Sequence, residues 1–448
     1  MSTIAQVRDA LQTMFSRCAE SANSKHQIIQ RQRKFSAVSI AKTFILGLLQ
    51  NPDASSEQLA GMAASCDAFV SKQAIEKRYT MRAARFFESL FCEATKLVVQ
   101  SDESLAPILE RFTEVNIGDC SAIQLPDSQQ DQFQGRGGSH GFGKSAMKLQ
   151  TELDLRTGCL KCVEAESSRA PDVSCARQTV NRESGTLRIN DLGYFNTATF
   201  ADLAAQDAWF LSRIQRTTTV WKADKNKGSV IRFLMSQKQT FIDCQVAIGT
   251  KHKIPCRLIA WRVPGKVAAE RRRKLKLNQK KRGRGTPTKE ALAACDWMFL
   301  VTNLPAEKLN AKEAIVLYRA RWQIELLFKR WKSIGMVSLL KAKNDAATMV
   351  RLWARLCAAL IQHWITVLCG WRSEHLISFA RVAKMIPTIV ENLADRLMLP
   401  SSIQSKEIER LLIRFQTKTE KSARRDKRKK IGTLELLRNP EKLDYLLS

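Results

Sequence analysis

Apolar residues in the first 110 positions recur at the spacing of helices. Ile40, Phe44 and Leu48 stand four residues apart, so one helical face carries all three. Ser55 and Gln58 have the spacing of a capping box, which favours the start of another helix at that point. The pattern predicts an all-α region over residues 1–110.

Two short helices inside this region form a candidate DNA-binding element. Residues 59–79 contain an apolar helix, a short break and a second helix that opens at Ser71. Lys72, Lys77 and Arg78 occupy polar positions of the second helix. This layout is typical of a helix-turn-helix, whose second helix enters the major groove of DNA. Two packed helices with a solvated basic face produce the same pattern, and the sequence does not choose between them.

The period of the apolar positions changes to two from about residue 117, which is the signature of strands. Residues 217–264 alternate like antiparallel hairpins and indicate a β-rich insertion. Strands and helices in mixed order indicate an α+β or α/β layer architecture. The expected elements are strands at 117–125, 146–155, 159–165, 186–191, 208–213 and 297–303, with a helix at 197–206.

A long predicted helix, 310–335, carries polar residues on one narrow stripe. At 100° per residue, the four members of the stripe fall within about 60° of one another. The opposite side is apolar and is expected to face the core. A solvated face of ion pairs is the ordinary interpretation of such a stripe. The stripe consists of Tyr318, Arg321, Glu325 and Lys332, with Trp322 and Lys329 beside it.

Positive charge is the strongest signal in the composition. The 448 residues include 73 Lys and Arg against 43 Asp and Glu, a formal net charge of +30. A polyanion would relieve the resulting self-repulsion, and nucleic acid is the first candidate. Hydrophobic residues make up 44% and charged residues 26%, which excludes disorder of the whole chain. At roughly 100–200 residues per domain, the length predicts two to four domains.

Two runs of basic residues concentrate this charge. Residues 271–285 hold nine basic residues and no acidic one, and residues 418–430 hold eight basic and two acidic residues. Such runs are often only solvated surface, but on so basic a chain the first favours contact with phosphates. The second is either a nucleic-acid-binding arm or a solubilising linker.

Membrane insertion and secretion are not expected. The most apolar run, 356–371, is interrupted by Gln362 and His363 and is shorter than the ~20 apolar residues that span a bilayer, so it predicts a buried helix. The N-terminus lacks the apolar core and cleavage site of a signal peptide. The 12 cysteines form no dense framework, which indicates reduced thiols in the cytoplasm.

A glycine-rich segment, 138–145, matches the phosphate-binding loop G-x-x-x-x-G-K-S letter for letter. That loop requires a strand before it and a helix after it, because the helix N-terminus helps to hold the phosphates. Here a polar stretch precedes the segment and an alternating strand follows it. We therefore expect a loop between strands and no bound nucleotide. An ATPase that depends on Lys144 is the alternative.

Three carboxylates are candidates for metal-dependent chemistry. Asp119 lies in the first predicted strand, Asp191 ends the fourth, and Glu325 lies on the polar stripe. Cleavage of a phosphodiester by two metal ions needs carboxylates that hold both ions. Taken singly, either aspartate is equally well a turn or strand-end residue, so the combination carries the prediction.

The spacing Tyr318-x2-Arg321-x3-Glu325-x6-Lys332 resembles the Y-x2-R-x3-E-x6-K signature of bacterial insertion-sequence DDE transposases of the insertion-sequence-four family. The similarity extends to IGDCSAIQLP around Asp119, to INDLGYF, to FLSRI and to WMFLVTNLP. It covers roughly residues 110–335 well. Cys120 and Ser121 depart slightly from the small hydroxyl residues that the family more often has after the first aspartate.

The resemblance implies an RNase H-like core in which Asp119, Asp191 and Glu325 bind two Mg²⁺ ions, for which Mn²⁺ would substitute. It also implies double-stranded DNA as the partner, namely the terminal inverted repeats of the element and target DNA, and a homodimer in a synaptic complex in a bacterial cytoplasm. The DNA-binding residues would be Tyr318, Arg321, Lys332, Lys329, Trp322, Trp297, Arg213, Lys72, Lys77 and Arg78. Trp297 and Trp322 would capture an unstacked base, although Trp297 fits equally well as a core residue of its strand.

The expected fold class is therefore α+β and multidomain, with a helical DNA-binding domain, an RNase H-like α/β core interrupted by a β-rich insertion, and a helical C-terminal region. The expected domains are a helical DNA-binding domain (1–110), the first part of the core (111–216), the insertion (217–290), the last core strand with the signature helices (291–372), and a helical, basic C-terminal region in which dimerisation is possible (373–448).

The expected activity is cut-and-paste transposition. The terminal phosphodiester would be hydrolysed, and the freed 3′-hydroxyl would then attack DNA in strand transfer. A metal-dependent DNA nuclease on the same core is one alternative. An inactive copy or a DNA-binding protein without catalysis is another.

Overall fold

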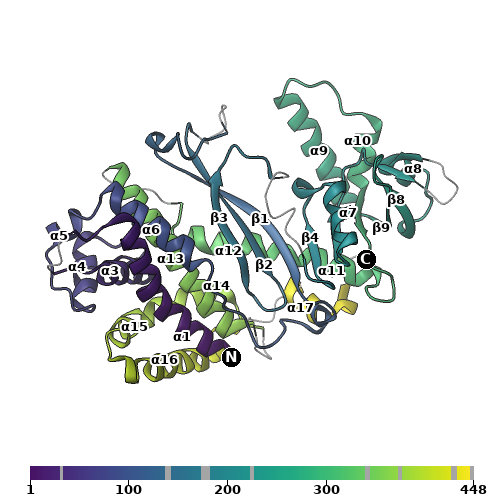
Figure 1. Cartoon of the computed structure of the whole chain (residues 1–448). Coiled ribbons are helices and arrows are strands. Elements are labelled where there is room, and N and C mark those ends of the chain that lie inside the picture. Colours follow the sequence, from purple (N-terminus) through teal and green to yellow (C-terminus); the bar gives the residue numbers. More distant parts are fainter. Residues whose placement is uncertain are drawn as a thin grey trace. The chain divides into compact units, whose positions relative to one another are not determined.

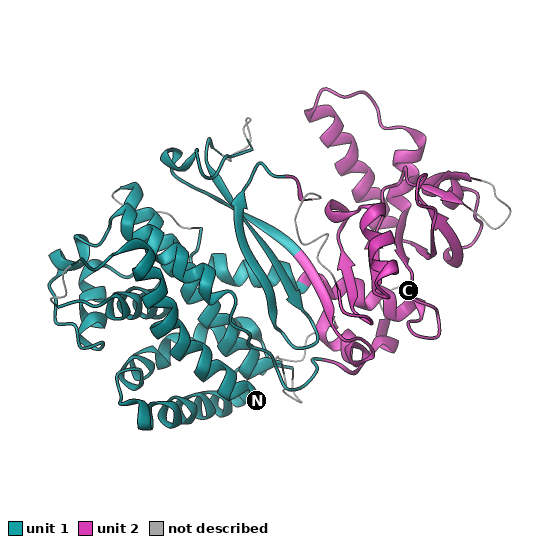
Figure 2. Ribbon diagram, in the orientation of Figure 1, with its two compact units in different colours: residues 1–105, 119–170, 323–429 teal, residues 106–118, 171–322, 430–448 magenta. Residues whose placement is uncertain are grey.

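The computed structural model describes residues 1–30, 34–136, 143–172, 182–221, 227–338, 344–371, 376–424 and 431–443. The chain divides into two compact units, each built from segments far apart in the sequence (Figure 2). Unit 1 comprises residues 1–105, 119–170 and 323–429, and unit 2 comprises residues 106–118, 171–322 and 430–448. Helices and strands occur in both units, and the strands belong to a large mixed sheet.

Unit 1 is mainly helical (Figure 1). Residues up to 105 form helices and no strand in the part that the structure describes, which confirms the predicted all-α N-terminal region. The helices of unit 1 are α1 (Thr3–Thr13), η1 (Met14–Cys18), α2 (Ala19–His26), α3 (Ala37–Gln50), α4 (Ser56–Ala64), α5 (Lys72–Glu76), α6 (Met81–Ala94), η3 (Asp127–Gln129), most of α12 (Trp322–Ser333), α13 (Asp345–Gly370), α14 (Phe379–Met385), η8 (Ile386–Ile389), α15 (Val390–Arg396) and α16 (Ser401–Ser422).

Helix α13 is the centre of this unit. It packs against α3 and α6 from the N-terminal part of the chain and against α14 and α16 from the C-terminal part (Figure 1). By length and composition it is apolar enough to cross a membrane, but its whole apolar window is buried inside the protein. This is the environment of a core helix, as predicted for residues 356–371.

A buried arginine joins α13 to two other segments of unit 1. The guanidinium of Arg355, 2% exposed, donates through Nε and Nη2 to the carbonyl of Pro52, at 2.9 and 2.6 Å. Its Nη1 donates to the carbonyl of Met336 at 3.1 Å. Buried carbonyls need such partners, so one side chain holds the loop after α3 and the turn after α12 against α13.

The C-terminal end of α13 packs against the turn between two strands. Nε2 of His363 donates to the carbonyl of Gly158 at 2.8 Å, and Nε1 of Trp371 donates to the carbonyl of Leu155 at 3.0 Å. Gly158 has a φ of +77°, and a Cβ there would lie 2.7 Å from the Trp371 ring. Glycine is therefore required both by the backbone conformation and by the close approach of the indole.

The predicted helix-turn-helix is only partly formed. Ser55 and Gln58 make the expected capping box at the start of α4. The second helix, α5, has 5 residues and ends before Lys77, because Thr80 already caps the next helix, α6. A full recognition helix that carries Lys72, Lys77 and Arg78 together is therefore absent from this described segment.

Strand β1 (Val115–Gln124) contributes its first residues to unit 2 and the rest to unit 1. In unit 1, β2 (Ala146–Asp154) pairs antiparallel with β3 (Leu160–Ser167) in the order β3-β2-β1. Because β2 directly follows Ser145, the glycine-rich segment leads into a strand and not into a helix, as predicted. Most of that segment, residues 138–142, lies outside the described residues.

The sheet of unit 2 has the order β1-β4-β5-β10-β9-β8-β6-β7, parallel from β1 to β5 and antiparallel from β5 onward. Its strands are β4 (Leu187–Asn190), β5 (Trp209–Arg213), β6 (Thr219–Trp221), β7 (Lys227–Ser229), β8 (Phe241–Ile248), β9 (Ile254–Arg262) and β10 (Trp297–Thr302). Its helices are η2 (Pro107–Arg111), η6 (Leu192–Tyr194), α7 (Thr197–Ala205), α8 (Val230–Met235), α9 (Gly265–Lys281), α10 (Lys289–Ala293), η7 (Ala294–Asp296), α11 (Ala311–Ala320), α17 (Thr433–Arg438) and η9 (Pro440–Leu443).

The predicted strands and the helix at 197–206 agree with the observed bounds within about two residues. Two regions differ from the prediction. Most of the first basic run lies on α9, so the insertion contains a long helix beside its hairpins. The predicted helix 310–335 is divided into α11 and α12 at Arg321, whose amide bonds to the carbonyl of Tyr318, three residues back instead of four. This tighter turn separates the four signature residues into two groups.

The buried imidazole of His363 makes stability depend on pH. Burial lowers the pKa of His363 to about 3, and it outweighs the hydrogen bond donated to Gly158, which acts in the opposite direction. Below about pH 6.5 the unfolded state binds a proton on His363 that the folded state excludes. The contribution of the neutral imidazole to the free energy of unfolding is therefore complete above pH 6.5 and is lost as the pH falls toward 3.

Urea unfolding of wild type and of His363→Gln tests this pH dependence. The advantage of wild type in the free energy of unfolding is expected to shrink by about 1 kcal/mol between pH 7 and pH 5.5. Glutamine does not titrate, so it serves as the internal reference. A difference between the two proteins that stays constant over this range would contradict the assignment.

Candidate active site

Two of the three predicted carboxylates line one pocket of unit 1. Asp119, on β1, and Glu325, on α12, face an open pocket of about 520 Å³. Phe328 and Ser333 complete its α12 side, and they were not singled out from the sequence although they lie one and two turns beyond Glu325. The lining residues are Asp119, Cys120, Ser121, Glu325, Phe328, Lys329, Lys332 and Ser333.

The position of α12 against β1 is fixed by one cation and by an apolar face. Nζ of Lys332 donates to the carbonyl of Ala122 on β1 at 3.1 Å. Burial lowers the pKa of Lys332. On the opposite side of the helix, Ile324, Leu327 and Trp331 are at most 2% exposed, as the periodicity predicted. Asp119 and Glu325 are therefore carried by two elements that are held together directly.

The third carboxylate belongs to a separate cluster in unit 2. Asp191 follows β4 and accepts a hydrogen bond from the hydroxyl of Tyr318 at 3.0 Å through Oδ1. Nη2 of Arg321 lies 3.9 Å from its other oxygen. Burial and the negative charge of Asp191 raise the pKa of Tyr318, so the phenol stays protonated and remains a donor.

This cluster changes the expected role of Tyr318. Its side chain is 8% exposed and its hydroxyl is engaged by Asp191, whereas the sequence pattern placed it on an exposed stripe for contact with phosphate. Arg321 is also largely covered, with a side chain 12% exposed. The sequence could not reveal this, because the burial of Tyr318 depends on how α11 packs against other elements of unit 2.

Carboxylate oxygens are the hard ligands that Mg²⁺ and Mn²⁺ prefer, so the donor set suits a divalent metal. Asp119 and Glu325 line an accessible pocket, which is the arrangement that entry of an ion requires. Among the described residues, no three Asp, Glu, His or Cys side chains are grouped closely enough to hold a metal ion. A joint metal site of Asp119, Asp191 and Glu325 stays a prediction.

The two candidate base-stacking tryptophans differ in exposure. Trp322, at the start of α12, is 52% exposed. Trp297, at the start of β10, is 3% exposed and belongs to the hydrophobic core of unit 2, with the guanidinium of Arg262 4.8 Å from its ring centre. The core interpretation, which the sequence left open, describes Trp297 in this structure.

The remaining predicted DNA-binding residues lie in different places. Lys329 is exposed at the carboxylate pocket of unit 1, and Arg213 ends β5 in unit 2. Lys72 and Lys77 are exposed on and just after α5. The guanidinium of Arg78 lies 5.4 Å from the ring centre of Phe35, so it packs on an aromatic ring at this site. Part of the basic run 418–430, residues 425–430, lies outside the described residues.

Comparison with known proteins matches residues 110–361 to the family described as the transposase DDE domain. The chain is similar to the transposase for insertion sequence element IS231B from Bacillus thuringiensis subsp. berliner, with 24% identity over 363 residues, 76% of this chain and 75% of that protein. It is equally similar to the transposase for IS1151 from Clostridium perfringens, with 24% identity over 372 residues and 75% of each chain.

A third relative is InsL of insertion sequence element IS186A from Escherichia coli (strain K12), with 36% identity over 235 residues, 49% of this chain and 61% of that protein. The family match spans more than half of the chain and contains all three carboxylates and the complete Tyr-Arg-Glu-Lys signature. The chain therefore belongs to the transposase DDE domain family and is a DNA transposase, an enzyme that cleaves DNA and transfers strands.

Proposed function

We propose that Asp119, Asp191 and Glu325 are the catalytic carboxylates and that together they bind divalent metal. The observation that supports this best is the pocket shared by Asp119 and Glu325, whose two elements are joined by the Lys332 hydrogen bond to Ala122. The family implies dependence on a divalent metal in general. Two Mg²⁺ ions, replaceable by Mn²⁺, are our proposal for its identity and number.

When bound, two such ions supply activation of the attacking hydroxyl and stabilisation of the leaving oxygen. The protein's own residues prepare the carboxylates for this role. The hydroxyl of Tyr318 donates a hydrogen bond to one oxygen of Asp191 and so orients that carboxylate, while Arg321 provides nearby positive charge. Residues that hydrogen-bond to a metal ligand fix its orientation, and their loss typically lowers metal affinity or activity about 10- to 100-fold.

Two exposed residues of α12 suit the DNA. Lys329 offers a solvated cation for a backbone phosphate, and Trp322 offers an exposed indole on which an unpaired base could stack. Lys332, in contrast, has its ammonium on the carbonyl of Ala122, so we assign it first to positioning α12. In our proposal the phosphodiester at the element end is hydrolysed, and the freed 3′-hydroxyl then attacks target DNA.

The wider organisation follows the same proposal. Residues 1–110 would bind DNA, 111–216 and 291–372 would form the RNase H-like core around the insertion 217–290, and 373–448 would contribute to a homodimer. The substrates would be the terminal inverted repeats of the element and target DNA, in a bacterial cytoplasm. The strongly positive net charge of +30 supports a nucleic-acid partner.

Glu325→Ala tests the catalytic assignment. Purified protein is incubated with Mg²⁺ and a duplex that contains the DNA flanking the gene of this protein. Cuts are expected at the element boundary. Loss of the Glu325 carboxylate should reduce the cleavage rate by about 1,000-fold or more, because bound metal stabilises the transition state by several kcal/mol. Glu307→Gln removes an exposed carboxylate elsewhere and should cleave like wild type. Equal cleavage by Glu325→Ala and wild type would contradict the assignment.

Tyr318→Phe tests the positioning of Asp191. Removal of one hydroxyl should lower the cleavage rate by about 10- to 100-fold and raise the Mn²⁺ concentration needed for half-maximal cleavage. Tyr79→Phe is the matched control, because the buried hydroxyl of Tyr79 has no hydrogen-bond partner within the described part of the chain. A rate loss without any change in metal dependence would indicate a merely structural hydroxyl.

A further inference from the structure

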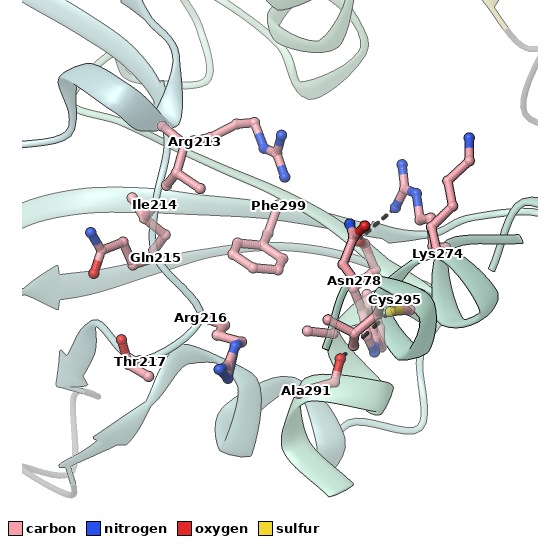
Figure 3. Close-up of a pocket in the computed structure, with 15 residues that line it drawn as sticks. Arg213, Ile214, Gln215, Arg216, Thr217, Lys274, Asn278, Ala291, Cys295 and Phe299 are labelled. Atoms are coloured by element: carbon pink, nitrogen blue, oxygen red, sulfur yellow. Dashed lines mark hydrogen bonds between the residues drawn. The ribbon is translucent and has the colours of Figure 1, made fainter. Parts of the chain in front are cut away.

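A large basic pocket lies in unit 2. It has a volume of about 690 Å³ and lies between the end of β5, helix α9 and strand β10 (Figure 3). Four cations line it, Arg213, Arg216, Arg271 and Lys274, and none of the described residues that line it is acidic. An anion is the ligand that such a lining favours.

The cations come from two elements that the fold brings together. On α9, Arg271, Lys274, Leu275 and Asn278 have the spacing i, i+3, i+4 and i+7, which places them on one helical face toward the pocket. Arg213 and Arg216 come from the end of β5 and the loop after it. In the close-up, Arg213 lies above and Arg216 below the ring of Phe299, and Lys274 stands on the helix to the right (Figure 3).

Core packing and one hydrogen bond hold the lining of the pocket in place. Its floor includes Ile214 (2% exposed) and Phe299 (8% exposed), and both belong to the hydrophobic core of unit 2. Nη1 of Arg271 donates to the carbonyl of Trp297 at 3.3 Å, which fixes that guanidinium. Burial and the nearby charge of Arg213 lower the pKa of Arg271, which indicates like charges held close together.

Two neighbouring arginines that are paired with acidic residues do not line the pocket. Arg272 is paired with Asp296, and Arg232 lies 3.3 Å from Glu290. Of the pocket cations, Lys274 lies 2.7 Å from Oε1 of Glu270 one turn earlier on α9. An exposed pair of this kind is worth little and gives way readily to a phosphate.

We propose that this pocket binds backbone phosphates of the DNA substrate, with Arg216 and Arg271 as forked donors and Lys274 as a point charge. Leu192, which directly follows Asp191, is part of the pocket wall, so a strand held here lies beside one of the proposed catalytic carboxylates. The insertion then positions DNA for cleavage. This inference rests on the transposase function and assigns the insertion a share of DNA binding.

The test measures binding without cleavage. A fluorescein-labelled duplex of about 30 base pairs, taken from the DNA flanking the gene, is titrated with protein in EDTA at several NaCl concentrations. Arg216→Gln/Lys274→Gln removes two pocket cations from exposed positions. Arg273→Gln/Lys276→Gln removes the same charge from the opposite face of α9 and is the matched control.

The pocket variant should lose about 1 per residue from the slope of log affinity against log salt, and about tenfold or more in affinity at 150 mM NaCl. The control should change the slope by less than half as much. Equal effects of both variants would overturn the proposal, because net charge alone would then explain them. Thermal unfolding of both variants checks that neither is destabilised.

Inorganic pyrophosphate separates DNA from a small anion as the occupant. If 1 mM pyrophosphate stabilises wild type but not the pocket variant, while DNA binding is the same in both, the site is a small-anion site and the DNA assignment is wrong. Because these readouts need neither metal nor cleavage, they fail independently of the catalytic assignment, which the Glu325→Ala cleavage test decides.

Discussion

The burial of helix α13 is the constraint on which unit 1 depends. A helix of 26 residues whose apolar window is completely buried must be covered on every side, and helices from both ends of the chain supply that cover. This core also has to accommodate buried cations, among them Arg355. Arg355 keeps a pKa of about 10 despite its burial, so it stays charged and needs the carbonyls of Pro52 and Met336.

The position of the proposed catalytic residues follows from this packing. The turn that ends α12 is held to α13 by Arg355, and α12 itself is held to β1 by Lys332. The elements that carry Asp119 and Glu325 are thus held in place by hydrogen bonds to main-chain carbonyls. In unit 2, a buried phenol gives Asp191 an equally defined orientation. Preorganisation of this kind is what metal-dependent cleavage requires.

The sequence predicted most of the secondary structure, because strands such as β2 and β10 alternate clearly and α13 is continuously apolar. The signature could be recognised because Tyr318, Arg321, Glu325 and Lys332 lie close together in the sequence. The joint role of the three carboxylates, which are far apart in the sequence, stays a prediction. The sequence did not predict the break at Arg321 or the burial of Tyr318, because both depend on how α11 and α12 pack against other elements. The exposure of Trp322 and the burial of Trp297 are likewise tertiary properties. The sequence singled out Arg213 and the basic run 271–285, but it could not show that they line one pocket with Arg216, because β5 and α9 are distant in sequence.

The central claim is that Asp119, Asp191 and Glu325 form one metal site. It is tested most directly by replacing Mg²⁺ with Fe²⁺ in the presence of ascorbate and element-end DNA, so that bound iron cuts the polypeptide next to its ligands. The account predicts cuts near residues 119, 191 and 325 together, suppressed by excess Mg²⁺ and lost in Glu325→Ala. Cuts near only one of these residues, or elsewhere in the chain and insensitive to Mg²⁺, would contradict it.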